Sequence, residues 1–244
     1  MKVQDGLKKG SHLKKAVIGA HPIIEHFIER LKLPEVISSY VKQDSRLQLP
    51  IEQTLKAVIH NILTSPLPLY EVSDWLKSLD ESSLGFSGSQ VDLIGDDRIG
   101  RSLEHFYEGR HKEAFFRLAL RAIKIFNLDC SQIHQDTTSV TFCGKYGGWS
   151  AAELLTHGYN KDHRPDLKQL VLGISVTSDG AVPLAHKIYD GNQTDDRVHL
   201  QNHDRLRRLL GRSDFVYVSD SKLATESNLA KISACGGTFI TVMP

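Results

Sequence analysis

The hydrophobic pattern of this 244-residue chain changes its period close to residue 130, and that change constrains the fold more than any other feature. Before this point, apolar residues recur at the spacing of an amphipathic helix. After it, short runs rich in β-branched residues alternate with helical segments. The sequence therefore predicts a basic flexible arm over residues 1–15, an all-helical domain over residues 16–129 and an α/β domain over residues 130–244, which makes the chain α+β overall.

Apolar stripes mark the helices of the first domain, and prolines at positions 34, 50, 66 and 68 separate them. Two predicted helices, at about 51–63 and 69–79, have a short connection and resemble a helix-turn-helix layout. A helical packing module without DNA contact is the alternative, since Lys77 is the only basic residue between positions 66 and 80. The stripes are Ile23, Ile24, Phe27, Ile28 and Leu31; Ile51, Leu55, Val58, Ile59 and Ile62; Leu69, Val72, Leu76 and Leu79; Ile99, Leu103, Phe106 and Tyr107; Phe115, Ala119, Ile123 and Phe126.

The second domain is predicted to contain a long first strand, a hairpin and then strands separated by helices. The order β-β-β-α-β-α-β implies a mixed sheet with helices packed on it. The predicted strands are 131–142, 168–178, 182–190, 215–219 and 238–243, and the predicted helices are about 194–210 and 225–234.

Asp136 lies in the middle of the first predicted strand, although aspartate is depleted in strands. Asp220 follows the strand 215–219, which the crossovers should place beside the first strand and parallel to it. Two carboxylates on neighbouring strands can share hard divalent cations. Aspartates that only cap strand ends or form turns are the alternative, because such residues are common.

Composition narrows the class of protein. The formal net charge is +1, so contacts with nucleic acid would come from local patches of charge. The three cysteines are odd in number and show no CxxC spacing, which fits a reducing cytoplasm. No run of residues reaches the ~20 apolar positions that a membrane helix needs, and we expect no membrane partner.

Four stretches resemble the DDE transposases of bacterial insertion sequences, in the group whose late signature is Tyr, Arg, Glu and Lys. The similarity extends from about residue 16 to the end. It implies an RNase H-like catalytic core behind an N-terminal helical domain. The stretches are DDRIGRSLEHFYEG (96–109), IHQDTTSVTF (133–142), HGYNKDHRPDLKQLVLGISVTSDGAVPLAHKIYDGNQTDD (157–196) and FVYVSDSKLATESNLAKI (215–232).

By this resemblance, Asp136 and Asp220 are the first and second catalytic aspartates and ligands of a two-metal Mg²⁺ or Mn²⁺ site. The implied reaction is cleavage of DNA at an element end and transfer of the 3′-OH to target DNA. The implied partners are element-end and target DNA, with a homodimer in a synaptic complex. The family's third carboxylate, a glutamate on a helix after the last core strand, would lie beyond Pro244, so we expect a chain truncated before that helix. Glu226 is expected to be a surface residue instead.

Two basic groups are candidate DNA contacts. The first is Lys161, His163, Arg164 and Lys168, for which a salt-bridged surface loop is the alternative. The second is Arg205 and Arg208, in a run with Arg207 and Arg212, for which a solvated helix face is the alternative. His134 shares a strand face with Asp136 and either supports the metal site or packs there.

Three functions remain open at this stage. The first is an insertion-sequence transposase, and the second is a non-catalytic DNA-binding remnant of one. The third is an RNase H-like nuclease that does not transpose DNA.

Overall fold

The computed structural model describes residues 16–42, 47–86, 88–144, 146, 154–158, 164–193 and 198–243. The chain forms two compact units, which divide between Ala114 and Phe115. The basic arm predicted at residues 1–15 lies outside the described residues. The predicted domains, with a boundary between residues 129 and 130, stay a prediction. The two compact units divide earlier in the chain, and the last helix before residue 130 belongs to the sheet-containing unit from Phe115 onward.

The described residues of the first unit form helices and 3₁₀ turns, as predicted, with one isolated β-bridge between Val17 and Leu79. The helix expected at 51–63 is α3, and the segment expected at 69–79 is a 3₁₀ turn followed by the short helix α4. One helix, α2, was not predicted. The elements are α1 (His21–Leu31), α2 (Leu33–Tyr40), α3 (Ile51–Thr64), η1 (Leu69–Glu71), α4 (Val72–Lys77), η2 (Glu81–Leu84), η3 (Gly88–Leu93) and α5 (Asp96–Glu108). The helix α6 (His111–Phe126) begins in this unit and continues into the next.

A buried network of charged and polar side chains connects α1 with α3. Lys56 is 2% exposed, and its Nζ lies 3.0 Å from Glu25 Oε1 and 3.1 Å from the carbonyl oxygen of Gly85. His60 Nε2 lies 3.2 Å from Glu25 Oε2, and His60 Nδ1 lies 3.1 Å from His21 Nδ1. Each imidazole thus has a partner, which a buried polar group requires.

Burial lowers the pKa of His21, and the neighbouring His60 lowers it further. Burial alone would raise the pKa of Glu25, but hydrogen bonds from His60 and Lys56 and the charge of Lys56 outweigh it, so this pKa is lowered. The network therefore favours a neutral His21 and an ionised Glu25, with Lys56 as its charge partner.

The second unit contains the mixed sheet that the sequence predicts. A two-residue strand, β2, was not predicted, and the last strand is shorter than expected. The strands are β1 (Gln132–Phe142), β2 (Thr156–His157), β3 (Lys168–Thr177), β4 (Pro183–Asp190), β5 (Val216–Val218) and β6 (Thr238–Ile240). The helical elements are the later part of α6, α7 (Val198–Leu210), η6 (Ser221–Leu223) and α8 (Glu226–Ala234).

The strand order explains how distant segments of the second unit meet. Strand β1 pairs antiparallel with β3 on one side and parallel with β5 on the other, and β5 pairs parallel with β6. Strand β4 pairs with β3. The order of the five main strands is therefore β4-β3-β1-β5-β6, which matches an RNase H-like core with the predicted topology.

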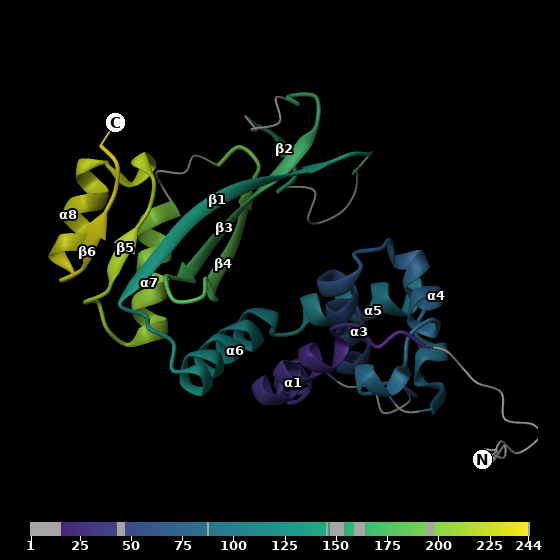
Figure 1. Ribbon diagram of the computed structural model, residues 1–244. Helices are drawn as coiled ribbons and strands as arrows, with labels where there is room; N and C mark the ends of the chain where they lie inside the picture. Colours follow the sequence, from purple (N-terminus) through teal and green to yellow (C-terminus); the bar gives the residue numbers. More distant parts are fainter. Residues whose placement is uncertain are drawn as a thin grey trace, which may run out of the picture. The chain divides into compact units, whose positions relative to one another are not determined.

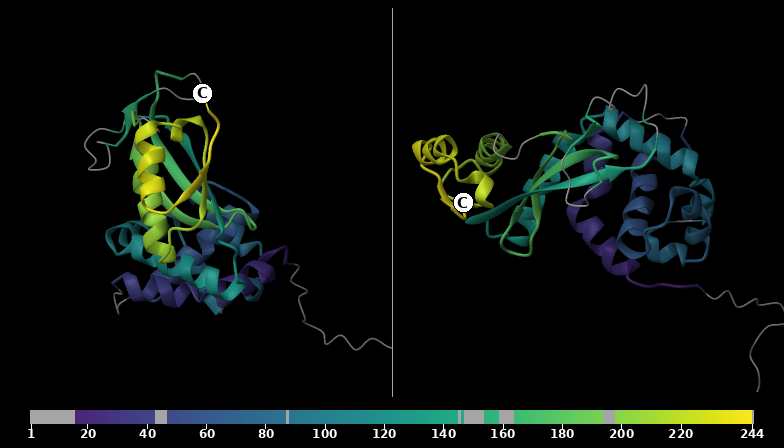
Figure 2. Two further views of the ribbon diagram at one scale, coloured as in Figure 1. Left: turned by 90° about the vertical axis from the view of Figure 1, so that its left-hand side faces the viewer. Right: turned by 90° about the horizontal axis from the view of Figure 1, so that it is seen from above.

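The two faces of this sheet differ in polarity. Ile133 and Tyr217 are fully buried and share an apolar core with Leu206 of α7 and Ile232 of α8, so both helices cover the same face. Figures 1 and 2 show α7 and α8 together on one side of the sheet. The alternating pattern of β1 turns His134, Asp136 and Thr138 toward the opposite face, where all three are exposed.

The contribution of this charge network to the stability of the first unit can be tested by mutation. Replacing Glu25 by Ala leaves the ammonium group of Lys56 buried without a counter-ion, and we expect a loss of about 3–5 kcal/mol in the free energy of unfolding. Urea unfolding followed by circular dichroism measures this loss. The double variant Glu25→Leu with Lys56→Met should recover most of it, because no buried charge remains. An unchanged midpoint for Glu25→Ala would show that the network does not hold α1 on α3.

Candidate active site

The parallel pairing of β1 with β5 brings the two predicted catalytic aspartates to neighbouring positions. The register pairs Gln132 with Val216 and His134 with Val218. Continued by two residues, it places Asp136 opposite Asp220. Because adjacent strands lie about 4.8 Å apart and residues two apart share a face, both carboxylates belong to the same exposed region of the sheet. The crossover geometry predicted from the sequence is therefore present.

Ser219 lies between Val218, the last residue of β5 that pairs with β1, and Asp220, and its hydrogen bonds keep this part of the chain extended. Its hydroxyl donates to the carbonyl oxygen of Gln135 at 2.9 Å, and its backbone N–H donates to the carbonyl oxygen of Ile240 at 3.1 Å. One residue further on, Thr241 Oγ1 donates to the carbonyl oxygen of Asp220 at 2.5 Å. These bonds hold the end of β5 between β1 and the segment that follows β6.

Each aspartate has one carboxylate oxygen engaged locally. Asp136 Oδ1 accepts from the backbone N–H of Thr137 at 2.7 Å, and Asp220 Oδ1 accepts from the backbone N–H of Lys222 at 3.1 Å, where it caps η6. Both residues are exposed. Within the described residues, neither Oδ2 atom has a hydrogen-bond partner, so one oxygen of each carboxylate faces solvent.

Two exposed carboxylates form only part of a metal-binding set. Among the residues that the structure describes, no group of three or more His, Cys, Asp or Glu side chains is placed to hold a metal ion. Magnesium nevertheless often binds proteins through one or two carboxylates, with water and substrate phosphate as its other ligands. The chemistry of the Asp136 and Asp220 pair fits such a cation.

Other acidic and polar residues near the pair have different partners. His134 Nε2 lies 3.2 Å from Gln132 Nε2 on the same strand. Glu226 is exposed in the first turn of α8, between β5 and β6, where a surface residue was expected. On the buried face of the sheet, which α7 and α8 cover, burial raises the pKa of the Tyr217 phenol well above its ordinary value, and Tyr189 and Asp220 raise it further.

The first basic group lies partly outside the described residues. Lys161 and His163 are in that part, so the structure does not place them. Arg164 Nε and Nη2 donate to the two carboxylate oxygens of Asp166 at 2.8 and 2.7 Å, and this pair raises the pKa of Arg164. Lys168 begins β3, opposite Phe142 at the far end of β1. Arg164 therefore forms the surface ion pair that the alternative interpretation predicts.

The second basic group lies along α7. Arg205 Nη1 donates to the carbonyl oxygen of His186 at 2.8 Å and thereby ties α7 to β4. Arg208 is exposed, and its Nε donates to the carbonyl oxygen of Asp204 at 3.3 Å. Of these two residues, Arg208 presents its guanidinium more openly to solvent.

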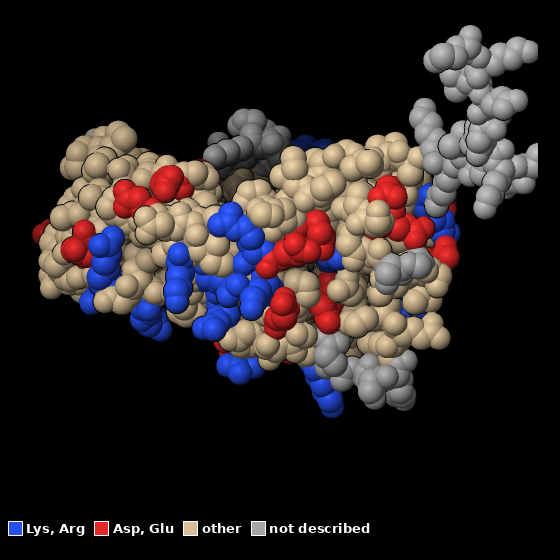
Figure 3. Space-filling view, turned by 60° about the horizontal axis from the view of Figure 1, so that its bottom comes forward, with Lys and Arg blue, Asp and Glu red and all other residues tan. Residues whose placement is uncertain are grey.

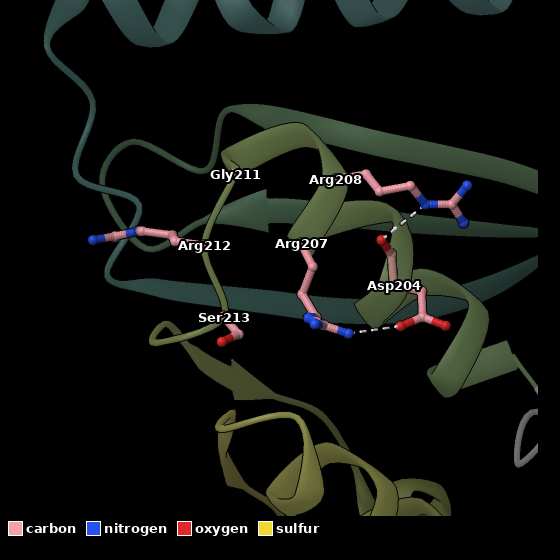
Figure 4. A pocket seen from close by; sticks show the side chains of 6 residues that line it. All are labelled: Asp204, Arg207, Arg208, Gly211, Arg212 and Ser213. Atoms are coloured by element: carbon pink, nitrogen blue, oxygen red, sulfur yellow. Dashed lines mark hydrogen bonds and ion pairs between the residues drawn. The ribbon is translucent and has the colours of Figure 1, made fainter.

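A cavity of about 540 Å³ lies where α7 ends, and Asp204, Arg207, Arg208, Gly211, Arg212 and Ser213 line it. Figure 4 shows Arg207 directed toward Asp204, whereas Arg208 and Arg212 point away from each other. The three guanidinium groups therefore form a row and do not converge on one point. Because α7 runs back along the sheet to the start of β5, this row lies at the edge opposite to Asp220.

Exposed basic residues are frequent on the second unit. Several groups of Lys and Arg side chains appear in the left-hand part of Figure 3, where this unit lies, with fewer acidic groups among them. Arg117 and Lys124 of α6 are exposed, as are Arg208 and Arg212. Local patches of positive charge are thus present although the chain as a whole is nearly neutral.

The loop after β4 contains a close backbone contact at Gly191. A Cβ atom on Gly191 would lie 2.1 Å from the carbonyl oxygen of Gln169 and 2.7 Å from that of Thr156. The carbonyl oxygen of Gly191 accepts from Gln169 Nε2 at 2.7 Å, and Thr156 Oγ1 donates to Asp190 Oδ1 at 2.5 Å. The glycine therefore allows the end of β4 to pack on β2 and β3.

Comparisons with known proteins can now be set beside this geometry. A family model described as a domain of unknown function, DUF4277, matches residues 13–120. No curated protein matches the chain in sequence. Among solved structures, the chain is similar to the piggyBac transposase in a synaptic complex with hairpin DNA, with a TM-score of 0.51 and 12% identity over 89% of this chain and 50% of that one.

The fold is transposase-like. At 12% identity the likeness concerns the fold alone, and the chain spans half the length of the piggyBac transposase. A Mos1 transposase in a paired-end complex with a left transposon end is a more distant match, with a TM-score of 0.32 and 9% identity over 88% of this chain and 65% of that one. Among the described residues, none of the helices has both the length and the apolar character needed to cross a membrane.

The close contact at Gly191 can be tested by its effect on the stability of the chain. The change Gly191→Ala places a methyl group against two backbone oxygens that have no freedom to move apart, so we expect a loss of about 1–3 kcal/mol in the free energy of unfolding. Thermal melting of the purified chain measures it. The control Gly100→Ala, in α5, adds a methyl group where nothing lies within 4 Å. Equal melting temperatures for the Gly191 variant and the wild type would contradict the described packing.

Proposed function

We propose that this chain belongs to a DNA transposase of the DDE type that acts on the ends of a bacterial insertion sequence. The observation that carries the proposal is the parallel pairing of β1 with β5, whose register, continued by two residues, would set Asp136 opposite Asp220. The transposase-like fold supports the same conclusion. The proposed family rests on the resemblance of the sequence motifs around both aspartates.

The proposed role of the two aspartates is to bind divalent cations and a DNA phosphate between them. Magnesium or manganese, when bound, neutralises charge on the entering and leaving oxygens of a phosphodiester. Asp136 and Asp220 would hold this cation through the oxygens that face solvent, while their other oxygens keep the carboxylates oriented through Thr137 and Lys222. Pairing with β3 along the whole of β1 fixes the position of Asp136.

A third carboxylate completes this type of site in the family that the sequence resembles. Arg164, Lys168 and Arg208 are the proposed phosphate contacts among the described residues, joined by Lys161 and His163 of the loop before β3. Arg205 is the weaker candidate of the original set, since His186 already accepts its N–H group. A homodimer on paired DNA ends is part of the same proposal.

Metal binding tests the role of the aspartates directly. We expect Asp136→Asn and Asp220→Asn each to weaken Mn²⁺ binding by at least about tenfold, because each removes one anionic oxygen ligand. Isothermal titration calorimetry on the chain measures this change. Asp214→Asn is the matched control, since this carboxylate is exposed and lies before β5 at the opposite edge. Equal Mn²⁺ affinity in all variants would overturn the metal site.

Nicking assays then separate the possible activities. A duplex that carries an element end is incubated with Mn²⁺ and with the chain. Cleavage that is lost in Asp136→Asn supports a transposase. Binding without cleavage would point to a non-catalytic DNA-binding protein, and cleavage of the RNA strand of a hybrid would point to an RNase H-like nuclease.

The proposed DNA contact at Arg208 has its own test. Replacing Arg208 by Gln should weaken DNA binding similarly for different sequences and should reduce the slope of log K against log salt by about 1. Fluorescence anisotropy at several salt concentrations measures both quantities. Lys231→Gln, on the exposed side of α8, serves as the control with the same change of charge. An unchanged slope for Arg208→Gln would place this side chain outside the DNA interface.

A further inference from the structure

A cavity of about 330 Å³ lies inside the helical unit, where α5 begins beside the start of α3. This volume is within the range of pockets that hold small ligands, which begins near ~300 Å³. The described residues that line it all belong to one compact unit, so its shape is set by the packing of that unit.

The two sides of the cavity differ in chemistry. Leu47, Ile51 and Leu93 form an apolar side. The first three turns of α5 form the other side, with Asp97, Arg98, Arg101, Ser102 and His105, so that two arginines and one carboxylate line it. A ligand that fits must therefore combine a compact apolar part with a negatively charged group.

Arg98 is held in place as part of the wall. Its Nε donates to Thr54 Oγ1 at 3.3 Å, and its Nη2 donates to the carbonyl oxygen of Leu49. Burial lowers the pKa of this guanidinium, and the nearby charge of Arg101 lowers it further. Two cations at one cavity repel each other, and a bound anion would relieve that repulsion.

Ser102 adds a second, independent observation. The residue is 4% exposed and lines the cavity. Its hydroxyl can donate a hydrogen bond to a ligand there or accept one from it. Arg101, by contrast, has only the exposed carboxylate of Asp97 as a partner, at 3.5 Å.

We propose that this cavity holds one unstacked nucleotide of single-stranded DNA, with the base on the Leu47, Ile51 and Leu93 side and a phosphate between Arg98 and Arg101. A nucleotide combines a flat base with an anion at a short distance, so that apolar side chains can contact the face of the base while guanidinium groups meet the phosphate. The choice of DNA as the source of the nucleotide rests on the proposed function. The shape and charge of the cavity are independent of that function.

The test uses the full chain and a fluorescein-labelled oligo(dT) of twelve nucleotides, with binding followed by anisotropy. Gly95 lines the cavity, its backbone is extended, and a Cβ atom there would meet nothing within 4 Å, so Gly95→Phe fills the cavity without backbone strain. Gly100→Phe is the matched control, because Gly100 is exposed on the same helix and a Cβ atom there also has open space. We expect Gly95→Phe to weaken binding by about tenfold or more and Gly100→Phe to leave it unchanged.

A second pair of variants protects the test against misfolding of the first. Arg101→Gln should weaken binding several-fold, whereas Arg110→Gln, which removes a similarly exposed arginine of the same unit, should not. Competition with an abasic oligonucleotide of equal length distinguishes a base pocket from a surface that attracts phosphates. The abasic strand is expected to compete about tenfold less well.

Three results would overturn the proposal. They are equal competition by abasic and base-bearing strands, unchanged binding by a folded Gly95→Phe variant, and competition by free dTMP as strong as that by the oligonucleotide. Two separate readouts keep the two proposals apart. Oligo(dT) binding that Gly95→Phe weakens, together with no nicking by the wild-type chain, would remove the proposed function and leave the nucleotide site.

Discussion

The parallel pairing of β5 with β1 is the interaction on which the architecture of the second unit depends. Strand β5 contributes only Val216–Val218, but Tyr217 is fully buried opposite Ile133, beneath α7. Hydrophobic burial on that face holds the strand, and the bonds of Ser219 to Gln135 and Ile240 extend the pairing beyond it. The aspartates on the solvent side are thus positioned by groups that do not take part in any chemistry.

The helical unit combines apolar packing with a buried polar network. Its apolar clusters include Leu76 and Ile99, and Ile37 and Leu55. Lys56, Glu25, His60 and His21 connect α1 with α3 through buried polar contacts. Such a network is stable only when every member has a partner. The network restricts how α1 can pack on α3, and so it favours a single arrangement of the helices in this unit.

Much of the fold could be predicted from the sequence, because hydrophobic period and turn residues dominate in long elements. The strands at 131–142, 168–178 and 182–190 agree with β1, β3 and β4 within a residue or so. Helix α2 was missed because its eight residues, LPEVISSY, contain too few turns to show a clear stripe. Strand β2 was missed because two residues paired with β3 carry no periodic signal, and only the tertiary contact at Gly191 reveals why they are held there.

The candidate site was predictable to a similar degree. Alternation along β1 places Asp136 on the solvent face, and the crossover rule places Asp220 beside it. The hydroxyl of Ser219 could not be foreseen, since its bond to Gln135 joins residues far apart in sequence. The orientation of Arg205 was equally hidden, because only the tertiary structure brings the carbonyl oxygen of His186 within its reach.

The difference in length between β1 and β5 has a consequence for how β1 is held. Strand β1 continues to Phe142, whereas its parallel neighbour ends at Val218, so the sheet has a step beside Asp136. Past that step, β1 is bordered by β3 but not by β5. Among the described residues, the backbone of β1 beyond Asp136 is therefore a strand edge on the β5 side, and β3 alone fixes its position through strand pairing.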